Sequence, residues 1–154
     1  MERDDTYYMQ LALYEAESAQ ISGEVPVGAV VVAGNEVLSS GHNESVKRHD
    51  PTGHAEIIAL RKAGALRRNH RLTDCDLYVT LEPCVMCLGA IVQARIRRLV
   101  FGALDPKSGA VQSVMTFPWE KSNHRIQING GILSEECGKI LKDFFLRKRQ
   151  APGA

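Results

Sequence analysis

The chain contains 154 residues, of which 44% are hydrophobic and 24% are charged, and its formal net charge is +1. This composition is ordinary for a soluble globular protein, and no low-complexity tract or internal repeat interrupts it. The length is that of one compact domain, which we expect to span residues 1–154. The near-neutral total charge does not indicate a nucleic-acid partner, although the last 16 or so residues are locally basic.

The first residues are acidic and no long apolar run follows them, so the sequence predicts neither a signal peptide nor a membrane span. We therefore expect a cytoplasmic, reducing environment. Cys75 and Cys137 are isolated in the sequence and are predicted to be buried thiols, whereas Cys84 and Cys87 are close enough to act together.

The N-terminal region is predicted to form a helix and a β-hairpin. Apolar residues recur at helical spacing over residues 6–21, and Asp4 or Asp5 is available as the N-cap. Residues 25–32 form an apolar, β-branched run that is ended by a Gly-Asn pair, and residues 36–41 are predicted to be the partner strand of a hairpin.

The middle of the chain is predicted to alternate between helices and strands. A polar loop over residues 44–52 ends at Thr52, which can cap a helix that begins near His54. Residues 77–81 are predicted to form a short strand, and Pro83 is well placed to begin the helix that follows it.

The C-terminal third is predicted to contain two strands and a final helix. Residues 98–102 form the first strand, residues 104–124 a loop with a helical turn, and residues 126–132 the last strand. Ser134 and the two glutamates after it are typical of a helix N-terminus. This order of elements predicts a three-layer α/β/α sandwich with a central mixed sheet of about five strands.

Two short motifs supply side chains of the kinds that bind zinc: His54-Ala55-Glu56 and the segment from Pro83 to Cys87. A structural zinc site is closed by four protein ligands, whereas one imidazole and two thiolates leave one position open for water. The carboxylate of Glu56, two residues after His54, is predicted to lie near the metal without binding it and to transfer protons. The motifs therefore predict a hydrolytic zinc centre with His54, Cys84 and Cys87 as ligands and Glu56 as the catalytic residue.

Other interpretations of the cysteine pair are open. A Cys-x-x-Cys at the start of a helix is also typical of a redox dithiol, and a structural zinc site could recruit Cys75 or Cys137. The proline before Cys84, the preceding strand and the upstream His-x-Glu together favour catalytic zinc over both.

With these motifs, the chain resembles the zinc-dependent nucleoside and nucleobase deaminases, and within them the bacterial tRNA-specific adenosine deaminases. Further segments that carry the resemblance are residues 23–30, His42-Asn43, 50–52, 77–82, 101–103, 123–125 and Phe144-Phe145. The resemblance implies a cytidine deaminase-like fold, one zinc ion per subunit and a homodimer. It also implies hydrolytic deamination of adenosine to inosine at the wobble position of a tRNA, with the anticodon stem-loop as the partner.

The resemblance further implies which residues meet the RNA. The implied contacts are Asn43, Asp105, Lys107, Asn123, Phe144 and Arg147. Asn43 would contact the flipped nucleoside, and the others would engage sugar, phosphate or neighbouring bases. Each also has a purely structural interpretation, because Asn43 can cap a turn, Asp105 can shape a loop and Phe144 can pack in the core.

Two other functions remain alternatives. A deaminase of free nucleobases or nucleotides, of the guanine or cytosine type, would use the same metal chemistry. A catalytically inactive deaminase fold could instead only bind RNA, although the presence of Glu56 argues against that interpretation.

Overall fold

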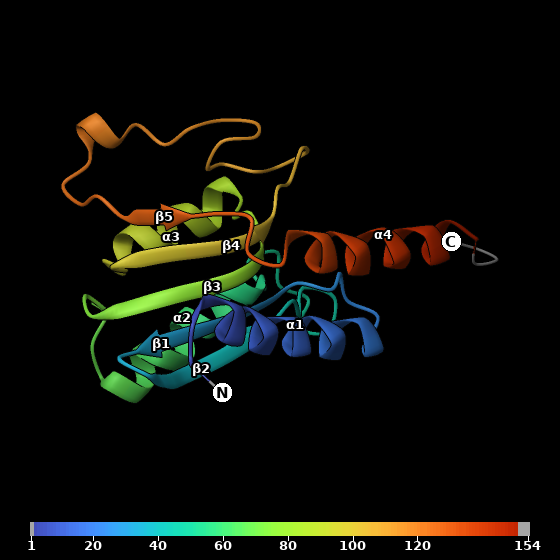
Figure 1. The fold of residues 1–154 in the computed structure, drawn as a ribbon, viewed down its shortest axis with the longest axis horizontal. Helices are drawn as coiled ribbons and strands as arrows, with labels where there is room; N and C mark the ends of the chain where they lie inside the picture. The colour runs from blue at the N-terminus through green and yellow to red at the C-terminus, as the bar shows by residue number, and fades with distance from the viewer. Residues whose placement is uncertain (1, 151–154) are drawn as a thin grey trace.

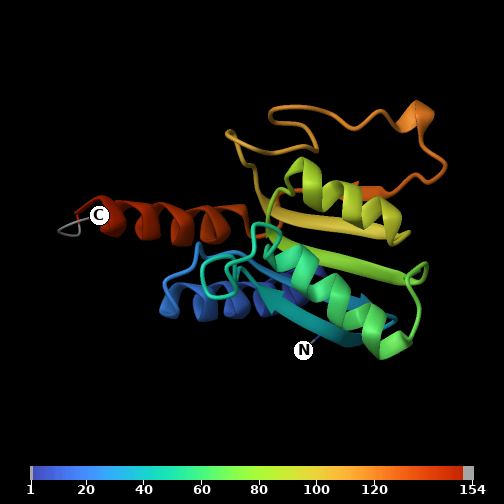
Figure 2. The same ribbon diagram turned by 180° about the vertical axis from the view of Figure 1, so that it is seen from behind.

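The computed structural model, which describes residues 2–150, consists of a five-stranded sheet with helices on both faces (Figure 1). Its elements are α1 (Asp5–Ile21), β1 (Gly28–Ala33), β2 (Glu36–His42), α2 (Ala55–Arg67), β3 (Cys75–Leu81), α3 (Val85–Gln93), β4 (Arg98–Ala103), the 3-10 helix η1 (Trp119–Lys121), β5 (Gln127–Asn129) and α4 (Ser134–Gln150). Figure 1 shows α1 in front of the sheet and α4 extending from one end of it, and Figure 2 shows α2 and α3 on the opposite face. The helix α4 packs on the same side as α1, because its Cys137 joins the core under α1. The predicted three-layer α/β/α sandwich with a mixed sheet is therefore confirmed.

The strands lie in the order β2-β1-β3-β4-β5. β1 is antiparallel to β2 and β3, whereas β3, β4 and β5 run parallel to one another. Parallel neighbours require a crossover connection, and α3 provides it between β3 and β4. The carboxyl ends of β3 and β4 therefore lie at the same end of the sheet, which is where ligand sites form in open α/β sheets.

Apolar side chains on the central strands form one core on each face of the sheet. The core under α2 and α3 includes Ala29, Val31, Leu77, Val79, Leu99 and Phe101, and the core under α1 includes Val30, Val32, Tyr78 and Val100. Neighbouring strand residues thus point to opposite faces, as the pleat requires. These strands are buried on both faces, which explains why they read as continuous apolar runs rather than as alternating ones.

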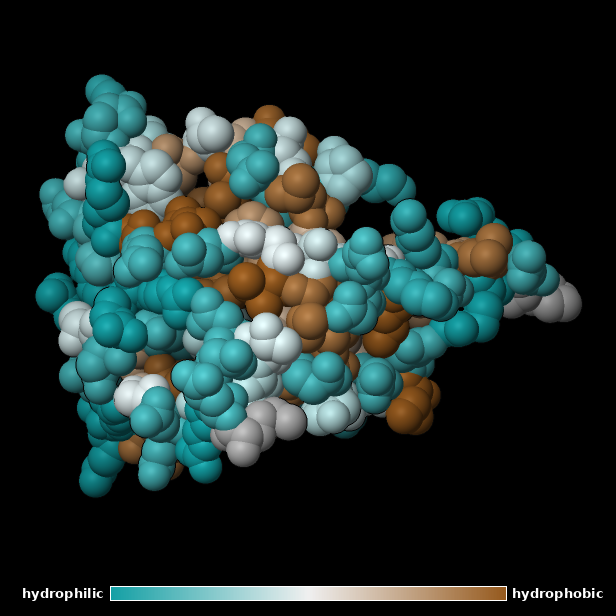
Figure 3. All heavy atoms as spheres, viewed as in Figure 1, coloured by the Kyte–Doolittle hydropathy of each residue, from teal (hydrophilic) through white to brown (hydrophobic). Residues whose placement is uncertain are grey.

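The helix α4 projects beyond the body of the protein, and hydrophilic residues cover most of the face on which it lies (Figure 3). The buried residues of α4 are Cys137 and Phe144, so most of its surface is open to solvent. Cys75 and Cys137 are free buried thiols, as predicted. No helix within residues 2–150 is both long enough and apolar enough to span a membrane.

One predicted helix cap is confirmed, and two predicted strands are shorter in the structure. Asp4 caps α1 as predicted, accepting the N–H of Tyr7 at 2.9 Å. The first strand begins at Gly28 rather than at residue 25, because Pro26 has no N–H to donate to a ladder. The last strand covers only Gln127–Asn129, since the glycine pair that follows turns the chain, with a φ of 91° at Gly131.

The predicted start of α2 near His54 is confirmed, whereas its predicted N-cap and the predicted first residue of α3 were both wrong. Thr52 does not cap α2, because its hydroxyl donates to Asp50 Oδ1 at 2.8 Å. The N-cap position is occupied by His54 instead. Pro83 lies before α3, which begins at Val85 with Cys84 at its N-cap. Two of the candidate ligands, His54 and Cys84, therefore both occupy N-cap positions.

Candidate metal centre and active site

His54, Cys84 and Cys87 meet where α2 and α3 begin, at the end of the sheet from which α4 extends (Figure 2). The Nδ1 atom of His54 lies 3.6 Å from Cys84 Sγ and 3.5 Å from Cys87 Sγ. All three potential ligand atoms lie within 4.8 Å of one another. The fold thus brings together the three residues predicted as ligands, although His54 and Cys84 are 30 positions apart in the chain.

This donor set fits a zinc ion. In a tetrahedral site with Zn–N near 2.0–2.1 Å and Zn–S near 2.3 Å, nitrogen and sulfur ligands are about 3.5–3.6 Å apart. Both measured distances from His54 Nδ1 to the cysteine sulfurs agree with this value. Among residues 2–150, the group that could hold a metal comprises these three side chains without Cys75 or Cys137, so the predicted open site is favoured over a closed structural one.

The two thiols titrate as a pair. A hydrogen bond from Cys87 lowers the pKa of Cys84 to about 4, and His54 acts in the same direction. The same hydrogen bond, together with burial, raises the pKa of Cys87. The pKa of His54 is raised, chiefly by its hydrogen bond with Cys84. Both sulfurs lie at the N-terminus of α3, where the helix dipole and a bound cation would each favour thiolates.

Glu56, in the first turn of α2, is only 4% exposed. Burial raises the pKa of Glu56 to about 7, whereas the nearby imidazole of His54 acts in the opposite direction. A carboxyl group with a pKa near neutrality can both accept and release a proton during one reaction. The structure therefore places a group suited to proton transfer two positions after His54, the N-cap residue of α2.

Asn43 stabilises the start of α2. Its side-chain Oδ1 accepts the N–H of Ala55 at 2.8 Å, and its own N–H donates to Val27 at 3.2 Å. Asn43 therefore supplies the cap that the sequence had assigned to Thr52, and it does so from the end of β2. The segment that contains His54 and Glu56 is held in place by this contact.

Three further residues implied to contact RNA, Asp105, Lys107 and Asn123, lie in the long connection between β4 and β5. Asp105 shapes the loop after β4, because its Oδ1 accepts the N–H groups of Lys107 at 3.0 Å and Ser108 at 3.2 Å. Lys107 is exposed on that loop, and Asn123 is exposed between η1 and β5. Sequence reasoning did not single out Glu82, the buried carboxylate that this loop surrounds; the only signal was an acidic residue directly after an apolar strand.

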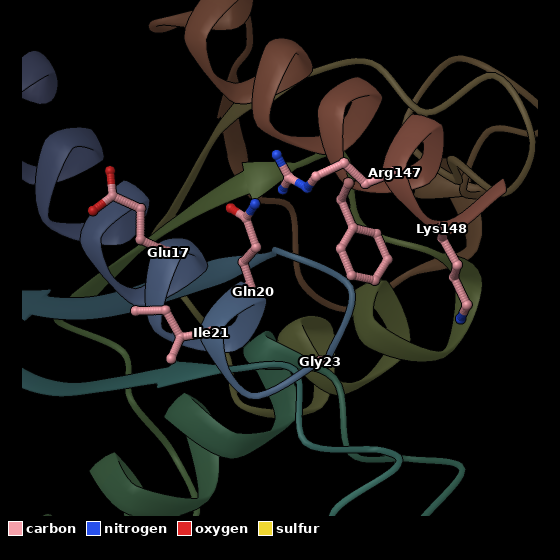
Figure 4. A pocket seen from close by; sticks show the side chains of 7 residues that line it. Glu17, Gln20, Ile21, Gly23, Arg147 and Lys148 are labelled. Atoms are coloured by element: carbon pink, nitrogen blue, oxygen red, sulfur yellow. The ribbon is translucent and has the colours of Figure 1, made fainter. Parts of the chain in front are cut away.

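A groove of about 670 Å³ lies between the end of α1 and the last turns of α4. It is lined by Glu17, Gln20, Ile21, Gly23, Phe144, Arg147 and Lys148. Phe144 is only 9% exposed, and Lys148 Nζ lies 5.8 Å from the centre of its ring. Figure 4 shows the side chains of Gln20 and Arg147 pointing toward one another across the groove. Of the two α4 residues implied to meet RNA, Arg147 is therefore exposed and Phe144 is largely packed against the protein.

Comparison with known proteins identifies the family. The family model of the MafB19-like deaminases matches residues 3–149. A tRNA-specific adenosine deaminase of Haemophilus influenzae is 47% identical, over 95% of this chain and 86% of the relative. The chain belongs to the tRNA-specific adenosine deaminase family. A second tRNA-specific adenosine deaminase, from Buchnera aphidicola subsp. Baizongia pistaciae, is 45% identical over 97% of this chain and 93% of the relative.

Solved structures agree with this deaminase assignment. A structure from a study of A-to-I editing by tRNA:A34 deaminases at the wobble position superposes with a TM-score of 0.85 and 46% identity, covering 88% of this chain and 99% of that one. A guanine deaminase from Nitrosomonas europaea superposes with a TM-score of 0.81 at 23% identity, covering 94% of this chain and 86% of that one, which establishes a shared fold. The predicted family and fold are both confirmed.

Replacing Cys87 with alanine should reduce zinc affinity at least about 100-fold, because a three-donor site cannot lose a thiolate without losing much of its binding energy. Metal content after dialysis, measured by mass spectrometry, should fall from one ion per chain to near zero. Cys75→Ala is the control and should retain the metal, since Cys75 lies outside the group. Full zinc occupancy in Cys87→Ala would contradict the assignment.

Zinc affinity of the unaltered protein should decrease as pH falls, because protons compete for both thiolates and for His54, whose pKa is raised.

Proposed function

We propose that this deaminase converts adenosine to inosine at the wobble position of a tRNA anticodon, using zinc held by His54, Cys84 and Cys87. The observation that carries the proposal is the three-donor centre beside the buried carboxylate of Glu56. Relatives 45–47% identical are named tRNA-specific adenosine deaminases, and a solved structure 46% identical comes from work on tRNA:A34 deaminases. The match to these relatives covers 95% and 97% of this chain.

The reaction replaces the C6 amino group of adenine with oxygen and releases ammonia. A zinc ion at the three donors supplies a water molecule whose pKa is lowered toward neutrality. Glu56 accepts a proton from the attacking water and transfers it to N1 of the base. Glu56 then takes the second proton, from the hydroxyl now bonded to C6, and delivers it to the amino group as the C6–N bond breaks, which leaves the C6 oxygen of inosine and releases ammonia. One carboxylate thus acts alternately as a base and as an acid. The pKa of about 7 for Glu56 suits both roles.

Two loops form the proposed entrance for the RNA. Unstacked bases of an anticodon loop can enter a pocket without breaking a duplex. We assign contacts with the flipped nucleoside to Asn43, at the start of one loop, and contacts with sugar, phosphate or neighbouring bases to Asp105 and Lys107 on the other. Asn123 would act from the segment before β5. The exposed apolar side chains of Leu104, Val114 and Met115 also lie along the second loop.

We also propose that the chain is a single deaminase domain over residues 1–154 that acts in the cytoplasm, where tRNA is available. The relatives are covered over 86% and 93% of their lengths, which supports one domain. All four cysteines are free thiols, which is consistent with a reducing compartment.

Zinc-loaded protein incubated with an adenosine-containing anticodon stem-loop should produce inosine, whereas free adenosine, adenine, guanine and cytosine should remain unchanged. Glu56→Ala should retain its zinc but lose about 10³-fold or more in turnover, because the proton-transfer group is removed while the ligands remain. Chromatography of digested RNA measures the product, and metal analysis measures occupancy. Deamination of free guanine or cytosine would favour the nucleobase alternative, and near-normal turnover by Glu56→Ala would contradict the catalytic role.

The last turns of α4 form the second proposed RNA contact. Arg147, Lys148 and Arg149 are consecutive and exposed, beside the groove between α1 and α4. Their positive charges can neutralise phosphates, and such contacts weaken with salt.

Changing Arg147, Lys148 and Arg149 together to alanine should weaken stem-loop binding by about tenfold at low salt. The slope of log affinity against log salt should fall by about 2, as expected when three contacts to single-stranded RNA are lost. Fluorescence anisotropy over a salt series measures both quantities. Lys139→Ala, on the first part of the same helix, removes a lysine that pairs with Asp143 at 2.7 Å and should leave the slope unchanged. An unchanged slope in the triple variant would remove α4 from the RNA interface.

A second copy of the chain is proposed to pack against α2 and α3. The α3 sequence, VMCLGAIVQ, contains no charged residue, and a helix that is apolar on all sides is normally buried on all sides. Val85 on α3 is nevertheless 58% exposed, and Leu66 on α2 is 63% exposed. A groove of about 840 Å³ between the two helices is lined in part by Ile57, Leu60 and Ala90. A homodimer would cover these surfaces beside the metal centre.

Light scattering should give a mass of about twice the 17.0 kDa of one chain. Ala90→Arg should shift the protein to monomer, because a buried unpaired charge is placed in the proposed interface. Tyr14→Arg is the control, since Tyr14 is 54% exposed on α1, on the opposite face of the sheet. A monomeric unaltered protein, or a dimer that survives Ala90→Arg, would contradict this interface.

A further inference from the structure

Glu82, the residue after β3, is a buried carboxylate at the edge of the metal centre. It is 2% exposed and lies two positions before Cys84. Its Oε1 accepts the N–H of Asp105 at 3.0 Å and the hydroxyl of Ser113. Its Oε2 accepts the N–H groups of Val111 at 3.0 Å, Gln112 at 2.9 Å and Ser113 at 3.1 Å. All of these donors belong to the loop formed by residues 105–113.

The loop is folded tightly around this carboxylate. A Cβ atom added to Gly109 would lie 2.3 Å from Glu82 Cδ, so only glycine allows the loop to pass this close. The N–H of Ala110 donates to the carbonyl of Pro83 at 2.9 Å, which attaches the loop to the residue before Cys84. The backbone groups of the loop are therefore satisfied by the segment that leads into α3, and the position of the loop depends on Glu82.

We propose that Glu82 is a positioning residue that fixes the 105–113 loop beside the metal centre before RNA binds. The loop includes Asp105 and Lys107, which the proposed function places against the RNA. A loop that is already ordered avoids the entropy cost of ordering on binding, so its preorganisation should appear in RNA affinity rather than in the rate of the chemical step. Glu82 acts through the loop and does not touch the reacting atoms.

The conservative change Glu82→Gln tests this role because an amide has one acceptor oxygen where the carboxylate has two. If the amide oxygen takes the place of Oε2, the amide NH₂ faces the N–H of Asp105, and two donors oppose each other. If it takes the place of Oε1, three N–H donors at Val111, Gln112 and Ser113 lose their acceptor. Either orientation detaches part of the loop while leaving the ligands of the metal unchanged.

Stem-loop binding is measured in a Glu56→Ala background to prevent turnover, and the single-turnover rate at saturating RNA is measured with Glu56 present. Glu82→Gln should raise the dissociation constant for the stem-loop about tenfold or more. It should retain one zinc ion per chain, and its rate at saturating RNA should stay within about threefold of the unaltered protein. Amide hydrogen exchange over residues 105–113 of the free protein should become faster.

Asp76→Asn is the matched control. Asp76 is also a buried carboxylate, 7% exposed, but it lies at the opposite end of β3 and pairs with Arg97 at 2.8 Å. Its loss should lower thermal stability without changing RNA affinity. If Asp76→Asn weakens binding as much as Glu82→Gln does, the effect is one of general stability and the proposal fails.

Gly109→Ala provides a second test if Glu82→Gln does not fold, because it displaces the loop while the carboxylate remains. It should also raise the dissociation constant, whereas Gly138→Ala, whose added Cβ meets nothing closer than 3.9 Å, should not. Unchanged affinity and unchanged exchange in Glu82→Gln and Gly109→Ala would overturn the proposal. Loss of zinc or of the saturating rate, with affinity unchanged, would do so too, because Glu82 would then act through Cys84.

This inference rests on the proposed function in that the ligand is RNA. The two can fail separately. A stem-loop that the unaltered protein neither binds nor edits would count against the proposed function. An editing protein whose affinity and loop exchange do not respond to Glu82→Gln would count only against the role of Glu82.

Discussion

The meeting of two helix N-termini at one end of the sheet is the constraint on which the rest of the structure depends. β3 and β4 are parallel, so α3 must cross over between them and begin at the carboxyl end of β3. α2 begins at the same end, and the caps of the two helices place His54 and Cys84 3.6 Å apart. The candidate metal site, the buried carboxylate of Glu56 beside it and the proposed entrance for substrate all follow from this one geometry.

Buried carboxylates hold the two loops around that site. Glu82 binds the 105–113 loop through four N–H groups and one hydroxyl. On the other side, Glu24 is 3% exposed and accepts the N–H groups of Val46 at 3.1 Å and Lys47 at 2.8 Å. A buried anion is costly unless several hydrogen bonds satisfy it, so each carboxylate favours a single conformation of the loop that supplies the donors. Loops that carry function are thereby attached to rigid strand and helix ends.

The surroundings of the site favour opposite charge states in neighbouring side chains. The helix dipole and a bound cation favour thiolates at Cys84 and Cys87, whereas burial favours the neutral form of Glu56. One short region thus combines two candidate thiolate ligands with a carboxyl group able to exchange a proton near neutral pH. The basic end of α4 lies outside this region and is exposed, which suits attraction of phosphates rather than proton transfer.

The sequence by itself determined the layered architecture, the family and the three candidate ligands, because apolar periodicity and short motifs are local signals. The ends of two strands were not predicted correctly from apolar content alone. The first strand begins only after Pro26, and the last strand ends before the glycine pair that follows β5. Only the tertiary structure decided that Asn43 caps α2, that Phe144 packs against the protein and that Glu82 organises a loop more than 20 positions further along the chain. These roles depend on which distant backbone N–H groups and side chains the fold brings within about 3 Å, and no spacing in the sequence encodes such contacts.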